Sequence, residues 1–455
     1  MALVESENLL ARDDDGYELA RRDAVWNGLK PHRYPSAIVL AESEQDVVDA
    51  VRYAADHGLK VKARSGGHSW TASSVRDGAL LIDLSRMNDV AFDASTGIAR
   101  VGPGARGRDL NGLLAEHNLF FPSGHCPTVG LGGFLLQGGW GWLSRKIGPA
   151  CMSVVAVDVV TADGSVIHAD EHQNTEWLWA ARGAGAGYFG VVTRFHLRCH
   201  ERPAAIWETH HVYPMEVRDQ VLRWALEEEP SFPDELEFAI MATTPRGPLG
   251  EVVPGPPALI VMCSVMSDSD EEAQAALALL DGCPVRSRAA VALPAQSRSF
   301  VELYDGPDSV EPEGFHWSAD GMWTNAGPDE LVPAVAELYD TIPEGASHVF
   351  WYAWREQALP DAAISVQGTL YLAAFGGWTD PAESEAMLAW PADQMRRLEP
   401  LSRGIQLADE NLVRRPARYL IDENAARLEE LRARFDPEGR FLSYLMPDEW
   451  TGVAP

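Results

Sequence analysis

A histidine and a cysteine stand side by side in the stretch SGHCPTVGLGG, residues 123–133. A cysteine nucleophile needs a histidine at hydrogen-bonding distance and an oxyanion hole. Adjacent side chains usually diverge, so the adjacency of His125 and Cys126 is weak evidence for such a pair. A metal site would need further histidine, cysteine or carboxylate ligands at short spacing, and this stretch has none. Because no G-x-S-x-G or H-E-x-x-H motif occurs either, the pair alone predicts no hydrolase, and we expect no metal.

A glycine-rich loop at residues 64–70, RSGGHSW, is more informative. It follows a predicted strand, and its two glycines allow consecutive backbone N–H groups to turn toward one point, as in a nest that binds phosphate or pyrophosphate. The guanidinium of Arg64 and the hydroxyls of Ser65 and Ser69 would add hydrogen-bond donors. A plain turn between a strand and a loop is the alternative interpretation.

A second glycine-rich segment spans residues 123–148. Its glycine density is too high for the interior of a helix or strand without a purpose. We therefore expect a flat or bulky group to lie close against this backbone, bordered by Trp140 and Trp142. A packed turn region is the alternative. The glycines of this segment that support the expectation are Gly124, Gly130, Gly132, Gly133, Gly138, Gly139 and Gly141.

A third motif, GAGAGYFG at residues 183–190, contains the spacing G-x-G-x-x-G that is typical of dinucleotide-binding turns. In such sites a strand precedes the motif and a helix follows it. Here a predicted helix precedes the motif and a predicted strand follows it. We interpret the motif as a tight turn and exclude an ordinary Rossmann site.

The elements around these loops alternate between strands and helices over the first 200 residues. The apolar run 37–41, a capped helix that begins after Ser43 and a strand at 60–64 predict a β-α-β unit. Residues 154–169 predict a β-hairpin with an Asp-Gly turn. These elements place the 64–70 loop at the end of a strand.

Beyond residue 203 the pattern changes to long strands interleaved with helices, up to about residue 400, which favours an α+β domain built on an antiparallel sheet. The last segment, 423–441, predicts an amphipathic helix closed by a Pro/Gly turn. Since 455 residues exceed one ordinary core, we expect two domains.

Charge and composition exclude several classes of partner. The chain has 37 basic and 67 acidic residues, a formal net charge of −30, and such a surface repels phosphate backbones, so we expect no nucleic acid. The N-terminus is acidic and lacks the apolar core of a signal peptide, and no run approaches the roughly 20 apolar residues of a membrane helix. We therefore expect a cytoplasmic protein without a membrane partner. Five widely spaced cysteines favour neither a disulfide framework nor a zinc cluster.

In combination, the GGH loop, the GHCPTVGLGG segment and the GYFGVVTRF strand closely resemble the flavin-dependent oxidases of the berberine bridge enzyme type, in the vanillyl-alcohol-oxidase-like flavoprotein superfamily. The resemblance implies an α+β fold with a PCMH-type FAD-binding domain of two α/β subdomains at residues 1–204. It implies a substrate domain, an antiparallel sheet flanked by helices, at residues 205–403. The C-terminal segment 404–455 would return to the FAD-binding domain.

The resemblance also implies the cofactor and its ligands. FAD would be bound covalently, with its 8α-methyl carbon on His68 and its C6 on Cys126. The 64–69 loop would bind the pyrophosphate, the 129–142 segment would run beside the cofactor, and Val192 would lie near the adenine. The expected cofactor-binding residues are Arg64, Ser65, Gly66, Gly67, His68, Ser69, Cys126, Val129, Gly130, Gly132, Gly133, Gly138, Gly139, Trp142 and Val192.

The catalytic base of the family does not carry over to this chain. Members commonly have a Y-x-N-Y-x-D stretch whose tyrosine helps to deprotonate the substrate, and the matching stretch here, GIQLAD, keeps only Asp409. We therefore expect Tyr371, on a predicted strand of the substrate domain, to be the base. Tyr352 and Tyr444 are further candidates, and half-buried packing is the alternative role for a strand tyrosine.

These features predict an FAD-dependent oxidase in which a hydride passes from a hydroxyl-bearing carbon of the substrate to flavin N5 and O2 is reduced to H2O2. The substrate would be a bulky small molecule such as a sugar, a glycosylated natural product or another secondary metabolite, and the protein a monomer or homodimer. A flavin dehydrogenase and an oxidative cyclase are alternatives on the same scaffold. A non-catalytic flavin-binding protein is a third alternative. The two attachment residues argue against it, because attachment at two positions should make the flavin a stronger oxidant, and this is useful only for redox turnover.

Overall fold

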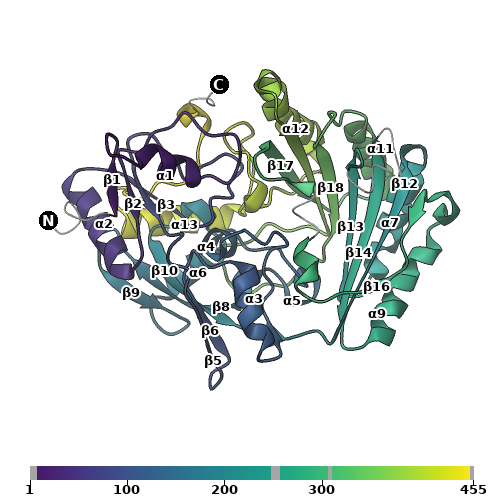
Figure 1. Ribbon diagram of the computed structural model, residues 1–455, viewed down its shortest axis with the longest axis horizontal. Coiled ribbons are helices and arrows are strands. Elements are labelled where there is room, and N and C mark those ends of the chain that lie inside the picture. Colours follow the sequence, from purple (N-terminus) through teal and green to yellow (C-terminus); the bar gives the residue numbers. More distant parts are fainter. Residues whose placement is uncertain (1–7, 247–256, 306–309, 451–455) are drawn as a thin grey trace.

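The computed structural model describes residues 8–246, 257–305 and 310–450. One half is built from the N-terminal residues and the C-terminal tail, and the other from the residues between them (Figure 1). The expected α+β class, with a PCMH-type half and a half built on an antiparallel sheet, is confirmed. Within these ranges no helix combines the length and the apolar character that crossing a membrane requires.

The first sheet carries the 64–70 loop at the end of a strand. Its elements are α1 (Tyr17–Asp23), α2 (Glu44–Asp56), β1 (Leu9–Ala11), β2 (Ala37–Leu40), β3 (Val61–Arg64) and β4 (Leu80–Asp83). The order is β1-β2-β4-β3, with β2, β4 and β3 parallel. Helix α2 begins at a capping box in which Ser43 and Asp46 each accept the other's backbone N–H. The predicted β-α-β unit is confirmed. It places the 64–70 loop at the edge of the sheet where the parallel strands have their carboxyl ends.

The second sheet is antiparallel, with the order β5-β6-β10-β8-β9. Its strands are β5 (Val90–Asp93), β6 (Ile98–Val101), β8 (Val154–Val160), β9 (Val166–Ala169) and β10 (Val191–Arg198). The predicted hairpin joins β8 to β9, and Gly164 in its turn has φ +75°. One face shares a core with α3 (Gly107–Ala115), α4 (Leu131–Leu136), α6 (Thr175–Ala181) and α13 (Asp422–Phe435). The motif at 183–190 is a 3-10 turn between α6 and β10, as predicted.

The C-terminal tail returns to the first sheet. The Val61 N–H donates to the Arg440 carbonyl at 2.8 Å, and the Leu442 N–H donates to the Val61 carbonyl at 3.0 Å. The Lys62 ammonium donates to the carbonyls of Leu442 and Ser443 at 2.8 and 2.9 Å. The tail therefore lies along β3, beside the strand that leads into the 64–70 loop.

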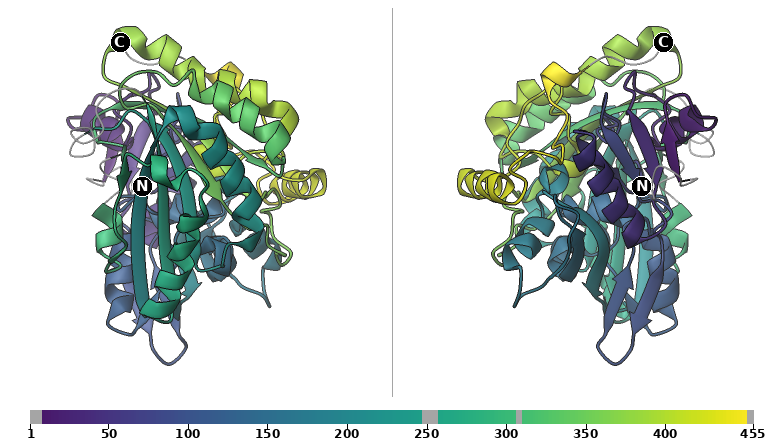
Figure 2. Two further views of the ribbon diagram at one scale, coloured as in Figure 1. Left: turned by 90° about the vertical axis from the view of Figure 1, so that its right-hand side faces the viewer. Right: turned by 90° about the vertical axis from the view of Figure 1, so that its left-hand side faces the viewer.

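The third sheet forms the other half, in the order β15-β12-β14-β13-β18-β19-β17, with β16 on β12. Its strands are β12 (Ala205–Pro214), β13 (Leu236–Thr243), β14 (Ala258–Ser267), β15 (Val291–Ala292), β16 (Gln296–Ser297), β17 (His316–Thr324), β18 (His348–Ala353) and β19 (Leu370–Trp378). Helices on one face are α7 (Arg218–Glu228), α9 (Asp270–Leu277), α11 (Pro328–Tyr339) and α12 (Ser384–Leu398) (Figures 1 and 2). Along β19, Leu370 and Leu372 enter that helix-covered core. Tyr371 and Phe375 face the other half, where they pack with Trp70 and Trp140.

Candidate functional site

The two glycine-rich segments meet backbone to backbone. A Cβ on Gly66 would lie 2.4 Å from the Gly130 nitrogen, and a Cβ on Gly130 would lie 2.6 Å from the Gly66 nitrogen. Side-chain atoms do not fit at such distances, so both positions require glycine. Gly67 has φ +75°, in the left-handed region, and completes the turn. These glycines allow close approach of two loops that are distant in the sequence.

His68 and Cys126 are held against one hydroxyl group. The His68 Nε2 lies 3.1 Å from the Thr128 Oγ1, and the Cys126 Sγ lies 3.3 Å from the same oxygen. Trp26 stacks on the His68 ring with the centroids 4.8 Å apart. Burial lowers the pKa of His68 to about 4, so the ring is neutral at pH 7 and keeps a nitrogen lone pair. The structure thus brings the two expected attachment residues together.

The backbone of the 64–70 loop fits an anionic group. Within the part of the chain that the structure describes, the N–H groups of Gly66, Gly67, His68 and Ser69 donate to no protein atom. A row of consecutive N–H groups around a left-handed glycine is the arrangement that binds phosphates. This donor set fits the pyrophosphate of FAD.

Arg64 and Ser65, two further expected phosphate donors, bond within the protein instead. The Arg64 Nη1 donates to both carboxylate oxygens of Asp83 at 2.8 and 3.0 Å, and its Nη2 donates to the Asp23 carbonyl at 2.8 Å. The Ser65 hydroxyl donates to the Pro103 carbonyl at 2.5 Å. Both side chains hold the loop in place, and their contact with the pyrophosphate stays a prediction.

The segment after Cys126 leads into α4 and turns beyond it. Gly133 on α4 faces open space, since a Cβ there would meet no atom within 4 Å. Gly138 and Gly139 have φ +105° and +74°, which redirects the chain. Trp142 packs in an apolar cluster between the halves and is 5% exposed, and its contact with the cofactor stays a prediction. Val192 is buried in β10, and its contact with adenine stays a prediction.

His125 connects this segment to the substrate half. Its Nε2 lies 3.1 Å from the Glu237 Oε2 on β13, and its ring centroid lies 5.9 Å from that of Tyr352. The other oxygen of Glu237 accepts the Leu143 N–H at 2.7 Å. His125, to which the sequence assigns no role, thus docks the second glycine segment onto the antiparallel sheet.

Tyr371 and Asp409 form a hydrogen-bonded pair beside the first loop. The Tyr371 hydroxyl donates to the Asp409 Oδ2, and the Trp70 Nε1 donates to the Oδ1 at 2.7 Å. Burial raises the pKa of Asp409 to about 6, and it raises the pKa of Tyr371 well above its usual value of 10. At pH 7 Asp409 is therefore ionised and Tyr371 is protonated. Because Trp70 belongs to the 64–70 loop, the pair lies where the two halves meet.

The other two expected tyrosines lie in different places. Tyr352 stands directly opposite Tyr371 in the β18–β19 register and faces the same side of the sheet. The Tyr444 hydroxyl instead accepts the Ala186 N–H at 3.0 Å, and its ring packs against Ile405. Tyr444 thus holds the 3-10 turn before β10, and its role as a candidate base stays a prediction.

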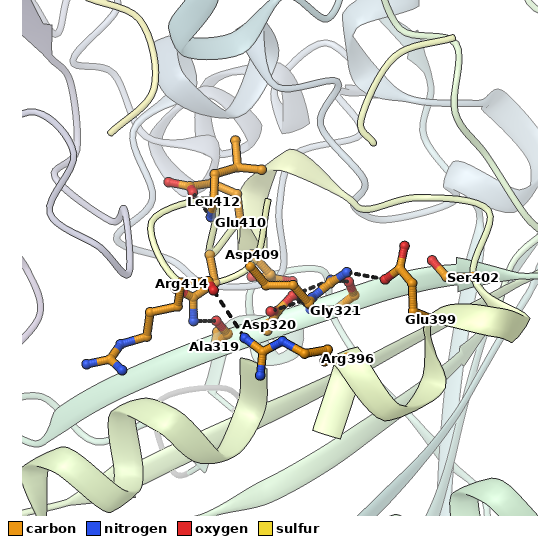
Figure 3. Close-up of polar contacts among 12 residues, drawn as sticks. Ala319, Asp320, Gly321, Arg396, Glu399, Ser402, Asp409, Glu410, Leu412 and Arg414 are labelled. Carbon is orange, nitrogen blue, oxygen red and sulfur yellow. Dashed lines mark hydrogen bonds and ion pairs between the residues drawn. The ribbon is translucent and has the colours of Figure 1, made fainter. Parts of the chain in front are cut away.

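A buried ion pair fixes the tail segment that carries Asp409. Arg415 donates through Nη2 and Nε to both oxygens of Asp320 on β17, at 2.6 and 2.9 Å. Its Nη1 donates to Glu399 at 2.7 Å. Figure 3 shows Asp320 on its strand, Glu399 just after α12 and Asp409 on the tail. Since β17 pairs with β19, these contacts also set the position of Asp409 relative to Tyr371.

Two features of the structure are not predicted from the sequence. Thr128 contacts both expected attachment residues, and its place two residues after Cys126 in the same motif is the signal that could have identified it. Asp158, His168 and His196 offer three ligand atoms that all lie within 4.8 Å of one another, although we expected no metal site. They come from three strands, so no local spacing reveals them.

Comparison with known proteins agrees with this site. Residues 35–170 match the family described as FAD binding domain. An FAD-linked oxidoreductase of Hypoxylon pulicicidum is 31% identical over 438 residues, 95% of each chain. The xylooligosaccharide oxidase of Thermothelomyces thermophilus is 40% identical over 172 residues, 37% of this chain and 34% of that one. The solved structure of BBE-like 1 from Physcomitrella patens superimposes with a TM-score of 0.82 at 20% identity and 98% coverage of both chains. The chain belongs to the FAD-linked oxidoreductases, and it is an enzyme of that class.

Proposed function

We propose that the chain binds FAD by two covalent bonds, from His68 to the 8α-methyl carbon and from Cys126 to C6, and that it oxidises a hydroxyl group of a bulky small molecule. The observation that carries the proposal is the shared contact of His68 and Cys126 with the Thr128 hydroxyl. The lowered pKa of His68 supports it, because only a neutral imidazole can form a bond to carbon. Thr128 occupies Nε2 and leaves Nδ1 for that bond.

The cofactor supplies the redox chemistry: when bound, FAD accepts a hydride from the substrate and passes the electrons to O2, which becomes H2O2. His68 and Cys126 would prevent dissociation of the cofactor. Binding therefore would not depend on a pocket that encloses the ring, and the site can stay wide enough for a bulky substrate.

Asp409 is the base in this proposal, and Tyr371 transmits the proton to it. The hydroxyl of Tyr371 already donates to Asp409, so a substrate hydroxyl that donates to the Tyr371 oxygen loses its proton as Tyr371 passes its own to the carboxylate. Trp70 holds the second carboxylate oxygen and keeps the acceptor oriented. This refines the expectation that Tyr371 alone is the base.

The aromatic side chains of β18 support a substrate with flat faces. Phe350 and Tyr352 stack with their centroids 5.4 Å apart, and Tyr352 and Trp354 stack at 5.5 Å. Phe350 and Tyr352 of β18 are partly exposed, so they can form apolar contacts with a sugar ring or with the aromatic part of a glycosylated compound. The similarity to a xylooligosaccharide oxidase supports the same substrate class.

The test is a panel of sugars, glycosides, simple alcohols and aromatic alcohols, incubated with flavin-loaded protein while H2O2 is measured by a coupled peroxidase. We expect peroxide from at least one class of hydroxyl compound. The matched control is Asp409→Asn, which keeps the flavin and loses the base. Bleaching of the flavin without peroxide would identify a dehydrogenase, and a ring-closed product would identify a cyclase. No flavin reduction across the panel would contradict hydroxyl oxidation.

A further inference from the structure

Three polar side chains meet on the face of the second sheet that lies opposite its core. Asp158 is the polar position between the buried Val157 and Val159 on β8. His168 stands directly opposite it on β9, and His196 comes from β10 on the other side. We propose that Asp158, His168 and His196 bind one divalent transition-metal ion of the zinc type, at a site separate from the flavin loops.

The geometry of the donor atoms suits such an ion. The His168 Nδ1 lies 2.6 Å from the Asp158 Oδ1, and the His196 Nε2 lies 3.1 Å from the Oδ2. In a tetrahedral zinc site, with bonds of about 2.0–2.2 Å, neighbouring ligand atoms are about 3.2–3.6 Å apart. The three ligand atoms here lie within 4.8 Å of one another, so small rotations of the side chains bring them around one centre. Two imidazoles and one carboxylate form a donor set that zinc and similar ions prefer.

Asp170 lies near the outer nitrogen of His168, where metal-binding histidines usually have a carboxylate or a carbonyl. Its Oδ2 lies 3.5 Å from the His168 Nε2, on the far side of the ring from Asp158. Asp170 itself accepts the N–H groups of His172 and Gln173 at 2.7 and 2.9 Å, which fixes its position. The His168 Nδ1 is hydrogen-bonded to Asp158 at 2.6 Å, and a metal ion would replace the proton between these two atoms, with the carboxylate of Asp170 favouring the Nε2–H form of the ring. Carboxylates therefore face both nitrogens of one imidazole, and a cation at Nδ1 balances this charge.

Charge and access allow a cation to bind. Two arginines lie nearby, and each has a carboxylate partner. The Arg194 Nε lies 4.0 Å from Asp158, but its Nη1 donates to Asp89 at 2.9 Å, while Arg100, opposite His196 on β6, has its Nη2 3.8 Å from Asp93. The side chains of Asp158, His168 and His196 are each partly exposed to solvent, so an ion can reach them. The site would join three neighbouring strands, which is a structural role.

The test is a calorimetric titration of Zn²⁺ into full-length, flavin-loaded protein from which metal has been removed with a chelator. We expect one ion per chain, with an affinity at least tenfold weaker in His168→Gln and in His196→Gln. Asp170→Asn should weaken binding about tenfold, because it removes only the orienting carboxylate. The matched control is His210→Gln, since His210 faces a single carboxylate, Glu208, at 3.3 Å in the other half.

The flavin absorption spectrum checks that each variant is folded. Unchanged affinity in both His168→Gln and His196→Gln, or the absence of a site with one ion per chain in the unmodified protein, would overturn the proposal. A loss of affinity in His210→Gln equal to that in His168→Gln would also overturn it, because binding would then reflect surface histidines in general.

Discussion

Asp409 is the one residue of the GIQLAD stretch that matches the motif typical of the family, and the structure gives it a partner. In that motif a tyrosine of the tail acts on the substrate. Here the tail supplies the carboxylate, and Tyr371 on β19 supplies the hydroxyl. The sequence indicates that the usual tyrosine is missing, but it cannot indicate that a strand residue lies within hydrogen-bonding distance of the aspartate.

The first prediction concerns the pH dependence of the reaction. Asp409 must be ionised to accept a proton, and burial raises its pKa to about 6, so kcat/KM should fall about tenfold per pH unit below pH 6. Asp409→Asn should lower kcat by about 10²–10⁴-fold and remove this acidic limb. Steady-state kinetics between pH 4.5 and 8 measure both effects. A variant that keeps the acidic limb would contradict the assignment of the base.

The second prediction concerns Tyr371→Phe. The hydrogen bond from Tyr371 lowers the pKa of Asp409, so its removal should raise that pKa and move the acidic limb to higher pH. The rate should also fall, because the path of the proton is lost. Tyr444→Phe is the matched control, since its hydroxyl bonds to the backbone at Ala186, and it should leave the limb in place. Equal pH profiles for the two variants would show that Tyr371 only packs.

At the scale of the elements, the site depends on how the tail is fixed to β17 and how the two glycine loops approach. The Arg415 and Asp320 side chains are 4% and 1% exposed, and their pairing anchors the segment that carries Asp409. Gly66 and Gly130 allow the loops of His68 and Cys126 to touch. Both contacts join segments that are distant in the sequence, and both determine how close the residues of the candidate site lie to one another.

The third prediction tests the buried ion pair. Arg415→Met leaves Asp320 as an unpaired buried charge and should destabilise the protein by about 3–5 kcal/mol. The double variant Asp320→Leu with Arg415→Met removes both charges and should recover most of that loss. Urea unfolding followed by tryptophan fluorescence measures the free energies. A double variant that is less stable than Arg415→Met would show that the pair itself provides the stability.

The fourth prediction tests the contact between the loops. An added methyl in Gly66→Ala would press against the Gly130 backbone, so we expect a loss of about 1–3 kcal/mol and less bound flavin. Gly112→Ala is the control, because Gly112 lies exposed on α3 with no atom near its missing side chain, and it should gain about 0.5–1 kcal/mol. Full flavin content and stability in Gly66→Ala would contradict the proposed loop contact.

At the scale of the whole molecule, the sequence predicts those elements whose ends and turns depend on residues close together in the chain. Helix α2 is identified by its capping residues, and the β8–β9 hairpin by its Asp-Gly turn. The sequence does not predict contacts between side chains that are distant along the chain. Trp142 lies in a glycine-rich stretch that suggests a cofactor wall, but the meeting of the two halves buries it in an apolar cluster. The sequence also does not indicate that Arg64 forms an ion pair with Asp83 on the neighbouring strand.

The Asp158, His168 and His196 cluster shows the same limit, since its members are spread over three strands and become neighbours only through the order of the sheet. The two glycine-rich loops can be recognised in the sequence because each carries a local glycine signature. His68 and Cys126 could be proposed as partners only from the resemblance, and the structure adds Thr128 as the physical contact between them.

The mass of the acid-denatured protein tests the central claim most directly. If His68 and Cys126 both bond to FAD, the unfolded chain should retain the mass of one FAD, and so should His68→Ala and Cys126→Ala singly. The double variant should release FAD on denaturation. An unmodified chain mass for the wild-type protein, with FAD free in the supernatant, would contradict covalent attachment.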